Sequence, residues 1–140
     1  MSSASFTRRQ TLDSTERVKS KKIAEELFKK GSSFFLYPFI VRKIILNKEL
    51  IEKDTPLSQI LIAVPKKKLR RAVDRNLVKR RVREAYRLNK FTLLDNLDQQ
   101  QIAFSLVYVA GKPLDYHFIE ERIKNILETL PNSDKKDTTI

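Results

Sequence analysis

The sequence predicts an α+β fold, an α/β sandwich in which one mixed sheet packs against helices in the order α-β-β-β-α-β-α. Short runs rich in β-branched and aromatic residues alternate with segments whose apolar residues recur at helical spacing. The 140 residues, of which 41% are hydrophobic, suffice for one domain with an apolar core. We expect this domain to span residues 14–131, between flexible tails at residues 1–13 and 132–140.

The first half of the chain predicts one helix followed by three strands. Residues 16–30 place apolar side chains on one helical face, and Gly31 provides a stop after them. Residues 34–46 are rich in aromatic and β-branched residues, and Pro38 divides them into two strands because proline lacks the ladder donor. Residues 57–64 form a short apolar run typical of a buried strand.

The second half predicts a long helix, a strand and a last helix. Most of residues 66–90 read as helix, and residues 101–109 read as a buried strand. Asp115 can cap the last helix because its carboxylate accepts hydrogen bonds from unpaired backbone N–H groups. One face of that helix carries an apolar stripe, which we expect to pack on the sheet. The stripe consists of Ile119, Ile123, Ile126, Leu127 and Leu130.

Residues 66–90 hold most of the net charge. They contain twelve Lys or Arg residues and two acidic residues, a net charge of +10, whereas the whole chain has +12. The other 115 residues carry 17 basic and 15 acidic residues and are nearly neutral. One strongly basic segment in an otherwise neutral protein is typical of proteins that bind polyanions.

A helical projection of the basic segment, at about 100° per residue, separates two halves. One half carries Arg71, Arg75, Asn76, Lys79, Arg80, Arg83 and Arg87. The other carries Leu77, Val78, Val82, Ala85 and Leu88, which we expect to pack inside, with Arg81 interrupting them. Six cations on one face repel one another, and a phosphate backbone relieves that repulsion. The alternative is a plain solvated face, but such faces usually mix both signs of charge.

The composition argues against a catalytic or metal centre in the protein. There is no cysteine, which excludes thiolate catalysis, disulfides and Cys-based zinc sites, and is compatible with a reducing cytosol. The one histidine, His117, cannot build a His-rich site, and we expect a surface or packing role for it. The carboxylate pairs Glu25-Glu26 and Glu120-Glu121 lie in helical segments, where we expect them to face solvent rather than converge on metal ions.

No segment predicts membrane insertion. The longest apolar run has eight residues, 34–41, with a proline inside it, whereas a membrane helix needs about 20. The first residues lack the apolar core of a signal peptide. We therefore expect a soluble, cytoplasmic protein.

The basic segment also carries a pattern of residue pairs. Arg75-Asn76 precedes Lys79-Arg80 and Arg83-Glu84, and Lys66-Lys67 follows the buried strand. This arrangement resembles the bacterial ribonuclease P protein component, in which a strand, a lysine pair and a helix with an Arg-Asn-Arg signature occur in this order. The resemblance covers residues 17–130, including the end of the first helix at residues 27–31.

One position departs from the family pattern. The third signature residue is Leu77 instead of arginine. Either one base contact is missing, or Arg80 or Arg81 supplies it.

The resemblance implies a role in tRNA processing. Proteins of that family bind a catalytic RNA and assist the endonucleolytic hydrolysis that removes the 5′ leader of precursor tRNA. The RNA performs the chemistry with Mg²⁺, so the protein alone would be non-catalytic and would bind no cofactor. The implied partners are the catalytic RNA and precursor tRNA, with one protein monomer per ribonucleoprotein. The family also implies a left-handed crossover at the basic helix.

Two surfaces follow from the resemblance. The RNA-binding surface would comprise Lys66, Lys67, Lys68, Arg71, Arg75, Asn76, Lys79, Arg80, Arg83 and Arg87. A cleft between the first helix and the sheet would bind the single-stranded leader through aromatic platforms and cations. Its candidates are Arg17, Lys21, Lys22 and Phe28 on the helix, and Phe34, Phe39 and Val41 on the strands.

Two other functions stay open. Charge alone is equally compatible with a ribosomal or other structural nucleic-acid-binding protein that has no role in cleavage. An autonomous protein nuclease would need acidic ligands that converge on one place, and the sequence gives no sign of them.

Overall fold

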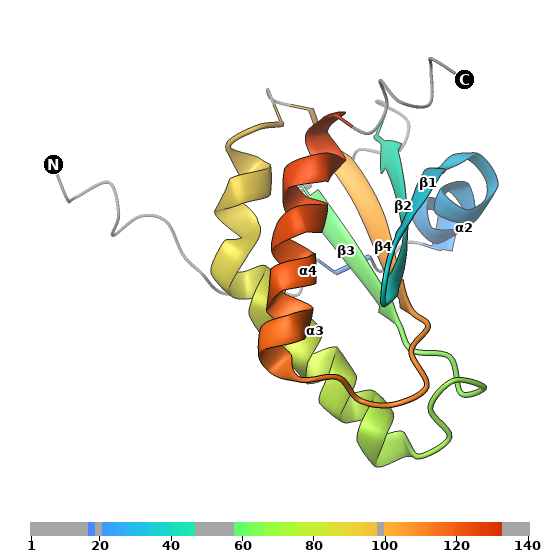
Figure 1. The fold of residues 1–140 in the computed structure, drawn as a ribbon. Helices are drawn as coiled ribbons and strands as arrows, with labels where there is room; N and C mark the ends of the chain where they lie inside the picture. The colour runs from blue at the N-terminus through green and yellow to red at the C-terminus, as the bar shows by residue number, and fades with distance from the viewer. Residues whose placement is uncertain (1–16, 19–20, 47–57, 98–99, 133–140) are drawn as a thin grey trace, which may run out of the picture.

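The computed structural model describes residues 17–18, 21–46, 58–97 and 100–132. In them a four-stranded sheet has one helix on one face and two helices on the other (Figure 1). The elements are α2 (Lys21–Lys30), β1 (Ser32–Leu36), β2 (Phe39–Ile45), β3 (Ser58–Ala63), α3 (Ala72–Leu94), β4 (Ile102–Tyr108), α4 (Tyr116–Thr129) and the 3₁₀ helix η2 (Leu130–Asn132). The predicted architecture and element order are confirmed. The predicted tails, apart from Asn132, lie outside the described residues.

The sheet is mixed, with the strand order β1-β2-β4-β3. β1 and β2 form an antiparallel hairpin, β2 pairs antiparallel with β4, and β3 runs parallel to β4. The hairpin turn is Tyr37-Pro38, so Pro38 does divide the aromatic region into a short strand and a longer one.

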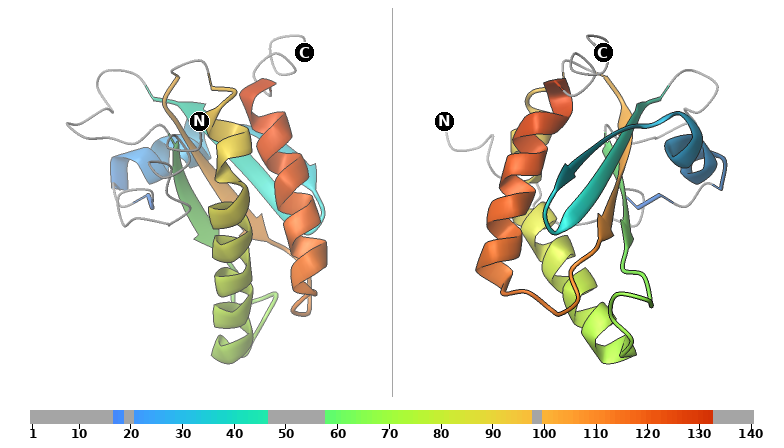
Figure 2. Two further views of the ribbon diagram at one scale, coloured as in Figure 1. Left: turned by 90° about the vertical axis from the view of Figure 1, so that its left-hand side faces the viewer. Right: turned by 45° about the vertical axis from the view of Figure 1, so that its right-hand side comes forward.

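The basic helix α3 connects the two parallel strands. It lies on the same face of the sheet as α4 and packs against it. Seen from that face, β3 lies to the left of β4 while both strands point downward (Figure 2, left). The β3–α3–β4 crossover is therefore left-handed, as the resemblance implies and against the strong preference for right-handed crossovers.

The larger core lies between the sheet and the pair α3 and α4. Side chains alternate along a strand, and those of Phe39, Val41 and Phe104 face these helices and are fully buried. The whole predicted stripe of α4 is buried in the same cluster, which confirms that part of the sequence analysis.

A smaller core lies on the other face, under α2. Ile23 and Leu27 of α2 pack there with Ile44 of β2 and Ala103 of β4. The helix is shorter than the predicted residues 16–30, because Arg17 forms a parallel bridge with Ile60 instead of joining it.

The bridge at Arg17 has a simple physical cause. β3 is an edge strand, and unpaired backbone groups along an edge accept an extended partner. The backbone N–H of Val18 donates to the carbonyl of Ile60 at 3.0 Å. Arg17 is thereby held beside β3 rather than on the first helix.

The buried face of α3 is turned relative to the expected one. Leu77 is only half-buried and Leu88 is 37% exposed, so their predicted burial is wrong. The buried residues of α3 are Val78, Val82, Ala85, Tyr86, Lys90 and Leu93. On the helical projection their centre lies roughly 80° closer to the cations than the centre of the predicted apolar half.

Two amphipathic side chains account for this rotation. Tyr86 and Lys90 can bury their apolar bodies if their polar ends find partners. The hydroxyl of Tyr86 forms a hydrogen bond with that of Ser58 on β3, and both residues are buried. Neither residue is apolar by type, so the helical pattern of apolar residues does not include them.

The start of α4 gives a test of the fold. The Asp115 side chain accepts a hydrogen bond from the backbone N–H of His117 at 3.0 Å, which confirms the predicted cap. Asp115→Ala should lower the free energy of unfolding by about 1 kcal/mol, because it leaves that N–H without its cap. Urea denaturation measures the loss. Asp115→Asn, which keeps an acceptor, should lose less, and equal losses would contradict the capping role.

Candidate nucleic-acid interface

The cations of the basic segment gather on the loop that follows β3 and on one side of α3. We call this set, Lys66, Lys67, Lys68, Arg71, Arg75, Asn76, Lys79, Arg80, Arg83 and Arg87, the basic surface. Its lysine loop, Lys66 to Lys68, is exposed, as are Arg71, Asn76 and Arg80, whereas the remaining four side chains are half-buried.

Arg75 holds the lysine loop against the helix. Its Nη1 donates to the backbone carbonyls of Leu69 and Arg70, both at 2.8 Å. The loop is tightened further by the N–H of Lys68, which donates to the carbonyl of Pro65 at 3.0 Å. The Nη1 group of Arg75 is therefore committed within the protein, and the residue sets the position of the neighbouring cations.

Arg87 is also committed in part. Its guanidinium donates two hydrogen bonds to Glu84 one turn earlier, of which the Nε–Oε1 bond is 3.0 Å. The hydrogen bond with Arg87 lowers the pKa of Glu84, and the same bond raises the pKa of Arg87. Both groups stay charged at neutral pH and partly cancel each other's field.

Arg81 and Leu77, the two irregular positions of the basic segment, have different surroundings. The Nη1 of Arg81 donates to the carbonyl of Leu114 and so ties α3 to the loop before α4. Leu77 is half-buried, and on the helical projection it lies outside the half that carries the cations. Of the two arginines that could replace the missing signature residue, Arg80 is the one with an exposed side chain.

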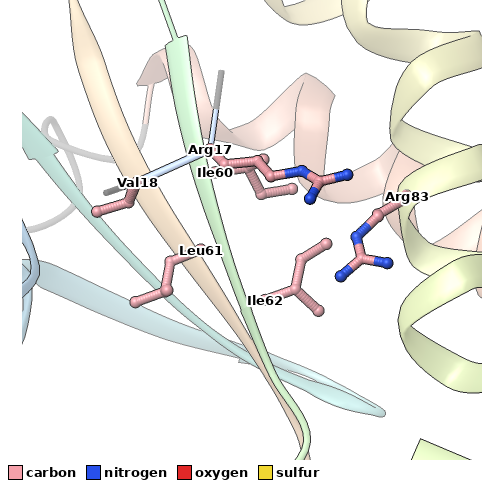
Figure 3. Close-up of a pocket in the computed structure, with 6 residues that line it drawn as sticks. All are labelled: Arg17, Val18, Ile60, Leu61, Ile62 and Arg83. Carbon is pink, nitrogen blue, oxygen red and sulfur yellow. The ribbon is translucent and has the colours of Figure 1, made fainter. Parts of the chain in front are cut away.

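A pocket of about 150 Å³ opens between the edge of the sheet and α3. Its apolar wall comes from Val18, Ile60, Leu61 and Ile62, and its polar groups are the guanidinium groups of Arg17 and Arg83. Figure 3 shows these two groups extending from opposite sides into the same space.

The electrostatics of the pocket favour an anion. Burial lowers the pKa of Arg83, and the nearby charge of Arg17 lowers it further. Among the described residues, no carboxylate lines the pocket. Two guanidinium groups above an apolar wall provide several N–H donors for one phosphate group.

The strand residues predicted for the leader cleft lie elsewhere. Phe39 and Val41 are fully buried in the core beneath α3 and α4, and Phe34 packs against the same core. The register explains the error: Phe34 pairs with Val41, so both side chains lie on the face opposite α2. Their placement in a cleft under the first helix is therefore wrong.

The face of the sheet toward α2 presents other side chains. Phe28 of α2 is 50% exposed, and the guanidinium carbon of Arg42 lies 5.2 Å from its ring centroid, a cation–π contact. Lys21 and Lys22 are exposed at the start of α2. Sequence reasoning missed Arg42, although its alternation with Val41 could have placed it on this face.

The acidic residues do not converge. In the described part of the chain, no group of three or more His, Cys, Asp or Glu side chains could hold a metal ion. Glu26 pairs with Lys30, and Glu120 accepts a hydrogen bond from Asn89. Within the described residues, no helix has both the length and the apolar character needed to cross a membrane.

Comparison with known proteins gives a consistent result. The family model for ribonuclease P matches residues 12–130. The ribonuclease P protein component of Porphyromonas gingivalis is 36% identical over 118 residues, which is 83% of each chain. That of Streptococcus pneumoniae serotype 4 is 31% identical over 114 residues, 81% of this chain and 80% of the other.

Solved structures agree on the fold. The RNase P protein of Staphylococcus aureus superimposes with a TM-score of 0.64 at 23% identity, covering 82% of this chain and 94% of that one. The RNase P protein of Thermotoga maritima gives 0.62 at 23% identity, covering 81% and 96%. Family model, relatives and fold together show that this chain belongs to the ribonuclease P protein component family.

Proposed function

We propose that this protein binds the catalytic RNA of ribonuclease P through its basic surface and assists removal of the 5′ leader from precursor tRNA. The observation that carries the proposal is the concentration of exposed cations on one side of α3 and on the loop before it. The RNA performs the phosphodiester hydrolysis with its own Mg²⁺, and the protein acts as a monomer in the cytoplasm.

The cations divide by role. Lys66, Lys67, Lys68, Arg71, Lys79 and Arg80 contact phosphates directly, each neutralised phosphate releasing condensed counterions. Arg75 keeps the lysine loop in register with the helix through its two carbonyl contacts. Asn76, exposed beside these cations, donates and accepts hydrogen bonds at the same surface.

The pocket between Arg17 and Arg83 takes one phosphate of the bound RNA. Its two guanidinium groups come from segments far apart in the sequence, one beside β3 and one on α3. A phosphate between them would replace the repulsion of two cations by two attractive contacts.

The leader contacts the face of the molecule formed by α2 and β2. Phe28 and Arg42 provide an exposed ring and a stacked cation, the combination that binds bases of single strands. Lys21 and Lys22 flank this pair with positive charge. The leader contact is thus assigned to the side of the sheet opposite Phe34, Phe39 and Val41.

The main experiment is reconstitution with the catalytic RNA. At low magnesium concentration, RNA plus protein should cleave precursor tRNA faster than RNA alone. Arg80→Glu should reduce this stimulation, whereas Lys124→Glu, the same charge change at an exposed site on α4, should leave it. A protein that binds RNA without stimulating cleavage would instead be the structural nucleic-acid-binding protein that charge alone allows.

Salt dependence tests the phosphate contacts. If five to eight phosphates are neutralised, log affinity should fall against log salt with a slope of roughly −4 to −7. Arg80→Ala should reduce that slope by about one unit, and Lys124→Ala should not change it. Arg87→Ala should change it less, because Glu84 already pairs with Arg87. Binding that does not respond to salt would contradict the phosphate contacts.

The leader assignment has its own test. Phe28→Ala should weaken binding of precursor tRNA by about five-fold or more, as expected for the loss of one stacked base, and should affect mature tRNA little. Leu88→Ala, which shortens an exposed apolar side chain on α3, serves as the control. Equal losses for both tRNAs would remove Phe28 from the leader site.

A further inference from the structure

A row of aromatic side chains runs from the β1–β2 hairpin to α4. The ring of Phe35 lies edge-on to that of Tyr37, with centroids 6.5 Å apart, and Tyr37 lies edge-on to Phe118 at 6.4 Å. The guanidinium of Arg122 lies over the Phe118 ring, 4.7 Å from its centroid. We call these four residues the aromatic strip.

The core does not account for the aromatic strip. Phe35 is 60% exposed and Tyr37 is 45% exposed, although rings of this size usually bury most of their surface. Phe35 belongs to β1, an edge strand, where exposed apolar residues favour unwanted strand pairing. Neighbouring exposed rings at such a position are typical of a binding surface.

Arg122 adds a second, independent observation. Its Nε atom is buried and has no hydrogen-bond partner among the described residues. The guanidinium lies on an aromatic ring, and none of the salt bridges in the described part of the chain involves it. An N–H donor that is covered yet unpaired costs free energy in the isolated protein, so hydrogen bonding among the described residues does not explain why Arg122 lies here.

The position of the strip relates it to the lysine loop. Phe39, next to the hairpin turn, pairs with Tyr108 near the end of β4, and Ala63 at the end of β3 pairs with Val107. The hairpin turn and the loop after β3 therefore leave the sheet at the same end, as Figure 1 shows. Three strand spacings separate β1 from β3, roughly 15 Å.

We propose that the aromatic strip stacks unpaired nucleobases of an RNA strand, as a site distinct from both the basic surface and the Phe28–Arg42 pair. Aromatic faces beside an arginine are the chemistry that binds single-stranded bases irrespective of sequence. A second copy of this chain is disfavoured as the occupant because each copy carries a net charge of +12. The inference rests on the proposed function only in taking RNA as the partner.

The test compares two strands of equal charge. Fluorescence anisotropy measures the affinity of the full chain for a labelled 12-nucleotide uridine strand and for an abasic strand of the same length. The wild type should prefer the base-bearing strand by about five-fold or more. Tyr37→Ala should reduce that preference several-fold while affinity for the abasic strand stays unchanged.

Arg122→Lys separates stacking from charge. It keeps the positive charge but loses the planar group, so it should reduce the preference for bases and leave the salt slope as it was. Ile45→Ala, at an exposed apolar site at the other end of β2, is the matched control. An unchanged preference in both Tyr37→Ala and Arg122→Lys would overturn the proposal, even if one variant folded poorly.

Photo-crosslinking locates the bases. A strand containing 5-bromouridine should form crosslinks in the peptides that carry Tyr37 or Phe118. Crosslinks confined to the peptide with Phe28 would overturn the proposal, as would a dimer in sedimentation experiments that Tyr37→Ala dissociates.

Two further arms separate the RNA sources and the two proposals. The affinity of the strip variants is measured for catalytic RNA alone, for precursor tRNA with a leader and for precursor tRNA without one. The RNA that the variants bind more weakly than the wild type does is the one that supplies the bases. If the protein failed to stimulate cleavage but kept its Tyr37-dependent preference for bases, the proposed function would fail and the strip would stand. If the protein stimulated cleavage but had no Tyr37-dependent preference for bases, the proposed function would stand and the proposal for the aromatic strip would fail.

Discussion

The burial of one face of α3 is the constraint on which the rest of the structure depends. Val78, Val82 and Ala85 are fully buried between the helix, the sheet and α4. Each valine buried in this way contributes about 1.5 kcal/mol or more, whereas a pair of like charges one turn apart on a helix costs a few tenths. Apolar packing therefore outweighs the mutual repulsion of the cations, and a helix that would be unfavourable alone is held in one orientation with its cations outward.

Fewer cations are available to a ligand than the basic segment contains. Arg75 supports the lysine loop, Arg81 ties α3 to the loop before α4, and Arg87 pairs with Glu84. These three arginines use their planar arrays of donors for fixed contacts inside the protein, a role that lysine fills poorly. Within the described part of the chain, no such side-chain contact holds the lysines of the loop, which are exposed. Some cations of the basic segment thus hold its structure in place, while others remain exposed to a ligand.

Elements in which one periodicity dominates could be predicted from the sequence. The α4 stripe and the strands were predictable because apolar residues repeat at 3.6 or 2 residues with little interference. Which side chains of β2 lie under which helices could not be predicted, because helices cover both sides of the sheet. Ile40 and Ile44 are as apolar as Phe39 and Val41, so alternation identified two sets without showing which lies under α2.

The remaining differences between predicted and observed burial come from polar residues whose side chains are largely apolar. Tyr86 and Lys90 rotate the buried face of α3, and Lys43 lies fully inside, with its Nζ donating to the carbonyl of Leu130 at 2.7 Å. Such burial depends on partners from distant parts of the chain, which no local pattern contains. Arg17 differs for the same reason, since its bridge to Ile60 is a tertiary contact.

The pocket between Arg17 and Arg83 joins this folding argument to binding. The bridge to β3 fixes the backbone of Arg17, and the buried face of α3 fixes the side of the helix on which Arg83 lies. Burial and, after it, the nearby charge of Arg17 lower the pKa of Arg83, so the charged form of Arg83 is disfavoured in the free protein. An anion bound between the two guanidinium groups would offset their mutual repulsion. Any anion that binds only the folded chain raises its stability by mass action. Under the proposed function, an RNA phosphate in this pocket would therefore also stabilise the β3–α3 region.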